Sequence, residues 1–401
     1  MVTTTGEVPF FNTFDPEFSF ESADLQHARE SAWYATTPAG LLVLRHAEAW
    51  ELARDARLGH DGQKYMELHG ITDGPLYDWF THMLSQINPT DHDRLRKLVS
   101  KAFTPRRVEA LRTFARTAAQ DLADRITPGQ TCEFIETFAN PLPARVICEA
   151  LGVPTEDHEW FRHYSDEIGL VFNSNLAALR PRVEAAVIHL TEYVDSLITR
   201  RTAQPGDDFI SALLAAHQDG QLGEDELRNL ILTLIFAGHD QVTCQLGRAL
   251  ATFADHPDQW DLLGRNPALA AGATDEAIRW CPSSQALIRY AFENITFRGL
   301  DIPAGTMIMV CNPAANRDPR AYPHGDRFDI TAQHEAHQLA FGGGLHRCLG
   351  IMLTKLEISE ALTVLAQRFG APHITEPVQW RPPGAIIYGA DSLPLTFPGR
   401  P

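Results

Sequence analysis

Residues 341–350 read FGGGLHRCLG, and residues 351–369 then repeat apolar side chains with the period of a helix. Three consecutive glycines allow a tight turn with positive φ, and we expect the following helix to begin at Cys348. A sulfur at a helix N-terminus meets free amide N–H groups and the positive end of the helix dipole, and both stabilise a thiolate. Cys348 is therefore a candidate metal ligand, whereas cysteines such as Cys132 and Cys311 are interpreted as small core residues.

The composition excludes several classes of protein. The chain has 34 basic and 51 acidic residues and a formal net charge of -17, which disfavours nucleic acid and anionic membrane surfaces as partners. Its six cysteines follow no paired spacing, so the pattern indicates neither a disulfide framework nor a zinc ribbon, and we expect a cytoplasmic protein. The first 18 residues show neither a signal peptide nor a membrane-spanning run.

The pattern of elements predicts a mainly helical chain with a small β-rich region. Residues 100–270 have helical periodicity, and an uninterrupted helix of roughly 48 Å is expected from Glu224 to Asp255. After Arg289 the sequence predicts a β-hairpin of residues 295–298 and 306–310, and further short strands at 385–395. No linker or repeat divides the chain, so a single domain of residues 1–401 is expected.

Residues 341–350 resemble the haem-binding loop of the cytochrome P450 superfamily, which has Phe, Gly, His, Cys and Gly at these spacings. The resemblance implies a helical prism with haem b between the long helix and the cysteine loop. It also implies that Cys348 is the axial thiolate ligand of the iron, with Phe341 beside the sulfur and His346 at a haem propionate. The implied cofactor-binding set also contains Gly342 and Gly350.

A second motif is the pair Glu276 and Arg279, which stand three residues apart and share a helix face. An isolated pair of this kind is usually a solvated contact of little value. The pair resembles, however, the Glu-x-x-Arg helix of the same superfamily, where it forms a structural triad with a downstream arginine. The resemblance assigns that third position to Arg327.

His92 and Arg96 lie four residues apart, which places both on one helical face. They resemble the family's propionate-binding His and Arg, and Arg289 resembles another propionate arginine. The segment between positions 94 and 107 carries six basic residues and no acidic one: Arg94, Arg96, Lys97, Lys101, Arg106 and Arg107. In the family this helix lies on the proximal side, so we expect it to bind a ferredoxin that is reduced by a ferredoxin reductase.

The expected catalytic set is Ala237, Gly238, Asp240 and Gln241. Residues 237–240 resemble the family's oxygen-binding stretch, after which a threonine normally follows. This chain has Gln241 instead, and Thr243 is rotated by about 200° from that position on a helix. Because an amide relays protons poorly, either Asp240 with water and a substrate group completes the relay, or the reaction needs less of it.

The resemblance implies oxidation of a small organic molecule, expected to be an aromatic secondary metabolite, with dioxygen. Gln241 suggests an alternative, oxidative C–C or C–N coupling of aromatic substrates such as cyclic dipeptides without oxygen insertion. Peroxide-driven chemistry and a non-catalytic haem-based sensor are further alternatives, although Asp240 beside the oxygen site favours an enzyme. By resemblance, the substrate is expected to contact the loop before His92, the helix from Ala237 to Gln241, the stretch from Ser284 to Ile288, and the turn around Ile386 and Ile387.

Overall fold

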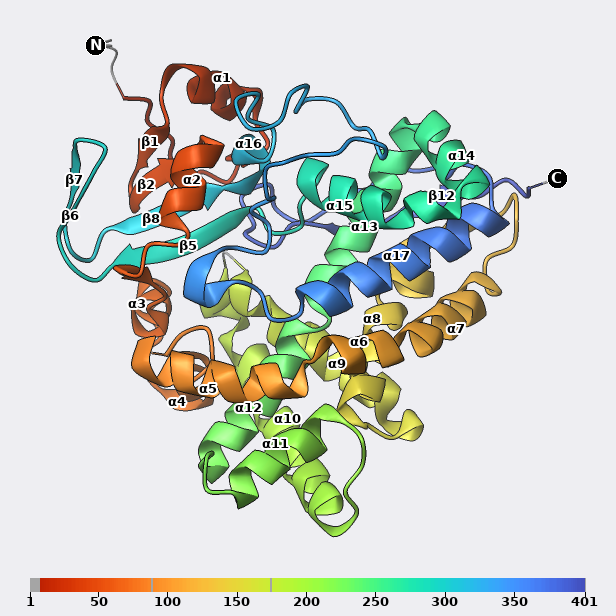
Figure 1. Cartoon of the computed structure of the whole chain (residues 1–401), viewed down its shortest axis with the longest axis horizontal. Helices are drawn as coiled ribbons and strands as arrows, with labels where there is room; N and C mark the ends of the chain where they lie inside the picture. Colours follow the sequence, from red (N-terminus) through yellow and green to blue (C-terminus); the bar gives the residue numbers. More distant parts are fainter. Residues whose placement is uncertain (1–7, 88, 174, 401) are drawn as a thin grey trace.

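The computed structural model describes residues 8–87, 89–173 and 175–400, and helix is the most common secondary structure among them. Figure 1 shows α13 in the middle of the molecule with α17 in front of it, and α12 lower down, behind α5. The first nine α-helices along the described chain are α1 (Ala23–Ser31), α2 (His46–Leu52), α3 (Gly62–Leu68), α4 (Gly74–Thr81), α5 (Pro89–Ala102), α6 (Pro105–Ala110), α7 (Arg112–Ala123), α8 (Pro141–Leu151) and α9 (His158–Gly169). The later helices are α10 (Leu176–Ala203), α11 (Phe209–Gln218), α12 (Glu224–Ala237), α13 (Asp240–Asp255), α14 (Pro257–Arg265), α15 (Ala270–Trp280), α16 (Asn312–Ala315) and α17 (Ile351–Arg368).

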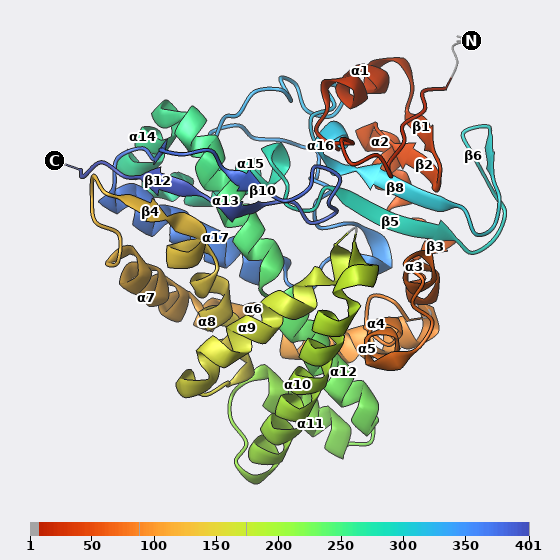
Figure 2. The same ribbon diagram turned by 180° about the vertical axis from the view of Figure 1, so that it is seen from behind.

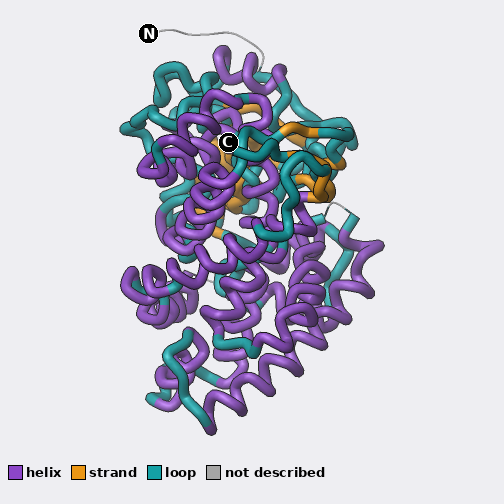
Figure 3. The backbone as a smooth tube through the Cα atoms, turned by 90° about the vertical axis from the view of Figure 1, so that its right-hand side faces the viewer, coloured by secondary structure: helices purple, strands orange, loops and turns teal. Residues whose placement is uncertain are grey.

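The strands gather in the upper half of Figure 3, so the expected mainly helical fold with a small β-rich region is confirmed. They are β1 (Tyr34–Thr37), β2 (Gly40–Val43), β3 (Leu58–Gly59), β4 (Thr131–Glu133), β5 (Ala286–Ala291), β6 (Ile295–Phe297), β7 (Leu300–Ile302), β8 (Met307–Cys311), β9 (His373–Ile374), β10 (Gln379–Trp380), β11 (Ala390–Ser392) and β12 (Pro394–Thr396). The largest sheet has the order β1-β2-β8-β5-β3, in which only β2 and β8 are parallel. Near the C-terminus, β12 pairs with both β4 and β9 (Figure 2).

The predicted β-hairpin is wrong in its pairing. Strand β6 turns at Arg298 and Gly299 and pairs with β7, whereas β8 pairs with β5 and β2 in the large sheet. Gly299 has a φ of 80° and Arg298 a φ of 48°, which makes the tight two-residue turn possible. The strands expected near residues 385–395 are present as β11 and β12.

The expected long helix begins at Glu224 and ends at Asp255, but it is interrupted between Ala237 and Asp240. Gly238 lies against α8, where a Cβ would come within 2.8 Å of the Ile147 side chain. The backbone of His239 is distorted from ideal helical values, with φ of -118° and ψ of -74°, and the amides of Val242 and Thr243 bond to its carbonyl. Close packing against α8 therefore coincides with the break. Of the helices the structure describes, none has the length and apolarity to cross a bilayer.

The pair Glu276 and Arg279 is buried, with side chains only 3% and 2% exposed and two hydrogen bonds of 2.7 Å between them. The expected role of the Arg327 side chain is wrong, because that side chain is 71% exposed. Arg279 bonds instead to the Arg327 carbonyl oxygen at 2.9 Å, and the side chain that approaches Glu276 is His334, at 3.2 Å. The third position of the triad thus acts through its main chain.

Removing one charge of this pair should be costly, because the other charge would remain buried without a partner. We expect Glu276→Gln to lower the free energy of unfolding by about 3–5 kcal/mol. The control Arg327→Ala should change it by less than about 0.5 kcal/mol, since the main-chain carbonyl remains. Equilibrium unfolding in urea measures both, and a large loss in the Arg327 variant would contradict the main-chain role.

Candidate active site

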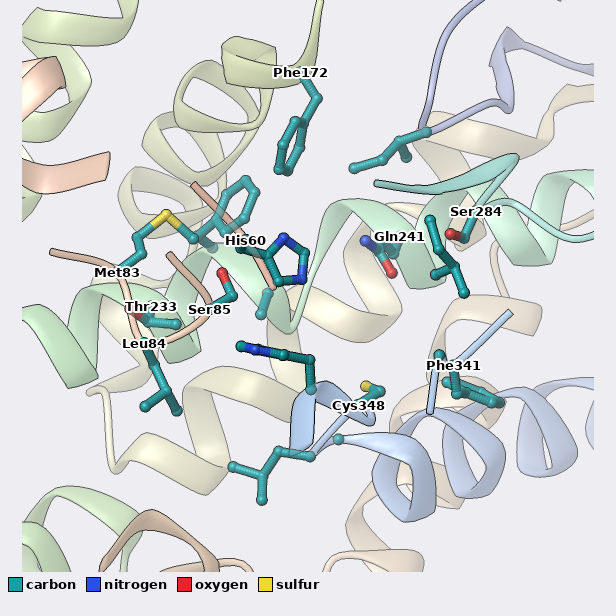
Figure 4. Close-up of a pocket in the computed structure, with 18 of the residues that line it drawn as sticks. His60, Met83, Leu84, Ser85, Phe172, Thr233, Gln241, Ser284, Phe341 and Cys348 are labelled. Atoms are coloured by element: carbon teal, nitrogen blue, oxygen red, sulfur yellow. The ribbon is translucent and has the colours of Figure 1, made fainter. Parts of the chain in front are cut away.

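A single cavity brings together the expected cofactor-binding, catalytic and substrate-facing residues (Figure 4). Its walls come from the loop before α5, α5 itself, the α12–α13 junction, β5, the cysteine loop and the turn at Ile386 and Ile387. The expected residues that line it are Phe341, Gly342, His346, Cys348, Gly350, His92, Arg96, Arg289, Ala237, Gly238, Asp240, Gln241, Ser284, Ile288, Ile386 and Ile387. Glu276, Arg279 and Arg327 do not line it.

A main-chain hydrogen bond and two glycines with positive φ fix the conformation of the cysteine loop. The Cys348 N–H donates to the Phe341 carbonyl oxygen at 2.8 Å, and Gly342 and Gly344 have φ values of 66° and 62° that favour glycine. The expected start of the helix at Cys348 is wrong by three residues, because α17 begins at Ile351. The Cys348 sulfur nevertheless lies within reach of the Gly350 and Ile351 amides at this helix start.

The protein alone stabilises a thiolate at Cys348 less than expected. Burial raises the pKa of Cys348, and although the Gly350 amide, Arg96 and the Ile351 amide lower it, the pKa stays above its ordinary value. A positive metal ion bound to the sulfur would reverse this balance, because a coordinated thiol is deprotonated. The sulfur is thus suited to a cation in the cavity.

A rim of cationic and hydrogen-bonding side chains lines the cavity near the cysteine loop. The rings of His92 and His346 lie 4.3 Å apart, and the Nδ1 atoms of both are buried without a hydrogen-bond partner among the described residues. Arg289 is 3% exposed and donates to His60 at 2.7 Å, while Arg96 donates to the Arg347 carbonyl oxygen. Sequence reasoning missed His60, which has no motif around it and whose partner lies 229 residues away.

The pKa values of this rim indicate which ligand it suits. Burial, followed by neighbouring positive charge, lowers the pKa of His92 to about 4 and of His346 to about 3, and burial lowers the pKa of Arg289 to about 10. An anion stabilises the charged forms of such groups, which burial and mutual repulsion destabilise. The rim therefore fits a large ligand that carries carboxylates, as haem does.

The opposite wall of the cavity is formed by the start of α13. Ala237 and Gln241 are exposed to the cavity, and no described residue bonds to the Gln241 side chain. Thr243 is buried and donates to the His239 carbonyl oxygen at 3.3 Å, so it faces away from Gln241, as expected. The Gln241 carbonyl accepts a hydrogen bond of 3.2 Å from the Ser283 hydroxyl.

Asp240 has a partner that sequence reasoning missed. Its two carboxylate oxygens accept hydrogen bonds of 2.9 and 2.6 Å from Arg381, which lies 141 residues away after β10. Burial raises the pKa of Asp240, but the charge and hydrogen bonds of Arg381 outweigh burial, so the pKa lies below its ordinary value. Asp240 is therefore an ionised carboxylate at neutral pH.

Aromatic and aliphatic side chains complete the cavity around the expected Ser284, Ile288, Ile386 and Ile387. Met83 lies in the loop before His92, where substrate contacts were expected, whereas sequence reasoning did not find Tyr65, Phe80, Phe172 and Phe236. The buried Asn312 amide donates to the Ser284 carbonyl oxygen at 2.8 Å and lies 3.4 Å from its Oγ, which fixes the backbone of Ser284 at the cavity wall. The cavity is thus mostly apolar above the cysteine, with few polar side chains.

Comparison with known proteins identifies the family. The family model described as Cytochrome P450 matches residues 269–379. Luteothin monooxygenase from Streptomyces thioluteus is 40% identical over 394 residues, which cover 98% of this chain and 96% of that protein. The 6-deoxyerythronolide B hydroxylase of Saccharopolyspora erythraea is 35% identical over 372 residues, covering 89% and 90%. The structure of cytochrome P450 CYP109Q5 from Chondromyces apiculatus superposes with a TM-score of 0.85 at 28% identity and covers 98% of this chain and 99% of that one.

The chain belongs to the cytochrome P450 family. It is a haem enzyme of the monooxygenase type that uses dioxygen, and its relatives tailor bacterial secondary metabolites. The cofactor is haem b, and the observed residues fit it: an accessible sulfur faces the cavity and the unpartnered histidine nitrogens and buried Arg289 suit its carboxylates.

The ion pair of Asp240 and Arg381 can be tested through its pH dependence. With Arg381 present, the lowered pKa of Asp240 stabilises the fold above about pH 4, and this contribution is lost as the pH falls through the lowered pKa. In Arg381→Gln, the main opposition to burial is lost and the pKa of Asp240 should rise, so the variant loses stability as the pH rises above about 4.

The difference in free energy of unfolding between the two proteins should therefore be small near pH 4 and grow to about 2 kcal/mol at pH 7. This value lies below that of a fully buried pair because the Arg381 side chain is 27% exposed. Urea unfolding at both pH values measures it. A difference that is independent of pH would contradict the lowered pKa.

Proposed function

We propose that Cys348 is the axial ligand of the haem iron and that the protein oxidises a small secondary metabolite with dioxygen. The supporting observation is the position of the sulfur, which the loop of residues 341–350 presents to the cavity below Gln241 (Figure 4). When bound, the haem activates dioxygen, and electron donation from a thiolate ligand favours O–O cleavage. The further roles of Phe341, Gly342 and Gly350 are to shape the loop around the sulfur.

The rim residues would hold the two haem carboxylates. We assign this role to His92, Arg96, Arg289 and His346, as the resemblance implied, and we add His60 because it lies 2.7 Å from Arg289. Burial disfavours the charged forms of these groups, and binding the two carboxylates would stabilise those forms. These residues would thereby also fix the orientation of the haem in the cavity.

The cavity wall supports a mainly apolar, aromatic substrate. Phe80, Phe172 and Phe236 supply aromatic contact area, and Ile288, Ile386 and Ile387 supply aliphatic contacts, as expected for a small-molecule site. The free amide of Gln241 and the Ser284 hydroxyl are the polar groups that could orient such a substrate. The names of the relatives, among them luteothin monooxygenase and a mycinamicin IV hydroxylase/epoxidase, support a natural-product pathway.

Oxidative coupling of aromatic substrates such as cyclic dipeptides is the second candidate, because Gln241 replaces the hydroxyl that normally follows Asp240. The Gln241 side chain has no protein partner among the described residues, so it is free to bind a substrate amide or carbonyl. Product analysis with labelled dioxygen separates the two: incorporated label supports oxygen insertion, and an unlabelled coupled product supports coupling. The relatives are enzymes, which disfavours the sensor alternative.

The ligand assignment predicts a spectroscopic result. The reduced protein treated with carbon monoxide should show the red-shifted Soret band of thiolate-ligated haem, and Cys348→Ala should lose it. The control Cys281→Ala should keep the band, because Cys281 is buried outside the cavity. Persistence of the band without Cys348 would refute the assignment.

Electrons would come from a ferredoxin and its reductase through a surface formed by α5, α6 and the cysteine loop. Several basic residues expected there are already paired: Lys97 with Asp93 at 2.6 Å, Arg107 with Asp207 at 3.1 Å, and Arg94 with Glu226. In the described part of the chain, Lys101, Arg106 and Arg347 are exposed and have no carboxylate partner. Leu345 and Met352, 45% and 38% exposed, add an apolar centre to this surface.

Charge reversal tests this docking surface. Lys101→Glu and Arg106→Glu should each slow ferredoxin-dependent reduction about tenfold at low salt and weaken its dependence on ionic strength. Lys97→Glu should have a smaller effect because Asp93 already neutralises it. Arg182→Glu is the control, since α10 lies on the opposite side of the molecule from α5 (Figures 1 and 2). Equal effects of all four variants would exclude this surface.

We also propose a reducing, cytoplasmic environment. This is supported by the six cysteines, all of which are free.

A further inference from the structure

The cavity carries a second pair of hydroxyl groups, Ser85 and Thr233, away from the cysteine loop. Figure 4 draws both on the same side of the cavity, with Gln241 on the other side. Ser85 belongs to the loop after α4, and Thr233 belongs to α12. These two segments pack together, since the rings of Trp79 on α4 and Phe236 on α12 have centroids 5.6 Å apart.

The two hydroxyl groups differ in what they offer to a ligand. Thr233 donates its only hydroxyl proton to the Asn229 carbonyl oxygen at 2.7 Å, so its oxygen can only accept a further hydrogen bond. Ser85 accepts a hydrogen bond of 3.3 Å from the Gln86 side-chain amide. Among the residues that the structure describes, none accepts the Ser85 hydroxyl proton, which is therefore available to a ligand. Thr233 thus needs a donor, and Ser85 supplies one.

A hydroxyl group on the substrate satisfies both positions at once. It can donate its proton to Thr233 and accept the proton of Ser85. An ether or a carbonyl group has no proton for Thr233, and an ammonium group has no lone pair for Ser85. Thr233 is only 8% exposed, so a mismatched group that displaces water there would leave a polar atom unpaired, which costs binding free energy. The hydrogen-bonding capacity of the pair therefore favours a hydroxyl group.

The side chains next to this pair are aromatic. Phe236 follows Thr233 by three residues on α12, so the two share a helix face. The ring centroid of Phe236 lies 5.7 Å from that of Phe172, which lies 6.0 Å from that of Phe80, and all three rings line the cavity. Aromatic rings attract a further ring at such distances in tilted or edge-to-face arrangements. The surroundings therefore favour a hydroxyl group carried by an aromatic ring, which is a phenol.

We propose that Ser85 and Thr233 bind a phenolic hydroxyl group at the end of the substrate remote from the atom that is oxidised. This inference rests on the proposed function and names the substrate class of the same site. Thr233 precedes Gln241 by eight residues, which correspond to about 12 Å along a helix axis. A substrate held by its hydroxyl group at Thr233 therefore presents a distant part of its skeleton to the region between Gln241 and Cys348. The pair thus selects elongated phenols and helps to determine which atom reacts.

Matched pairs of probes test this assignment on the haem-loaded protein without turnover. The probes are para-phenylphenol, para-(phenylethyl)phenol and para-(phenylbutyl)phenol, each compared with its own methyl ether, and calorimetry measures the Kd of each. We expect at least one phenol to bind the wild type about tenfold more tightly than its ether, as for one or two buried hydrogen bonds. Thr233→Val, which keeps the shape but removes the acceptor, and Ser85→Ala should each remove most of this preference. Thr233→Ser should retain it.

Thr191→Val is the matched control, because Thr191 also donates to the carbonyl oxygen four residues before it, at 2.7 Å, but lies on α10 outside the cavity. It should keep the wild-type preference, and every variant should keep the carbon monoxide spectrum. The proposal would be overturned by a wild type that binds phenols and ethers equally or binds none of the probes, or by an unchanged preference in Thr233→Val or Ser85→Ala. A failure of the proposed function appears separately, as a wild-type protein that lacks the thiolate spectrum.

Discussion

The constraint on which this structure depends is the burial of several cationic side chains around one cavity. His92, Arg289 and His346 have pKa values lowered by burial, so the protein alone gives them no adequate counter-charge. The buried thiol of Cys348 has the opposite need, because its pKa is raised in the absence of a bound cation. A ligand that combines a central cation with peripheral carboxylates satisfies both, so binding of haem and stability of the fold are coupled.

The break between α12 and α13 forms the opposite wall of the cavity, where Asp240 pairs with Arg381. It places Asp240 where Arg381 can reach it with two hydrogen bonds, although the two residues are 141 positions apart. This ion pair ties the segment after β10 to the central helix. The same segment carries Ile386 and Ile387, so the ion pair also holds the part of the C-terminal region that closes the cavity.

Sequence patterns could predict what is encoded locally and could not predict contacts between distant segments. The loop around Cys348 and the Glu276–Arg279 pair are contiguous motifs, and the helix that includes Glu224 has clear periodicity. His60 and Arg381 have no local signal, because their roles arise from partners 229 and 141 residues away. The helix break was not predicted because it coincides with packing against Ile147 of another helix, which a local pattern does not show. Arg327 was misassigned because a pattern of side chains cannot show that a position acts through its carbonyl.

Two hydroxyl groups near the α12–α13 junction are hydrogen-bonded to the main chain. Thr243 donates to the His239 carbonyl oxygen and Ser283 donates to the Gln241 carbonyl oxygen, so both hydroxyls satisfy main-chain acceptors. Groups fixed in this way stabilise an irregular backbone, but their protons are not directed into the cavity. The Gln241 side chain, by contrast, faces the cavity and has no hydrogen bond to any described residue, so its amide is left to bind substrate.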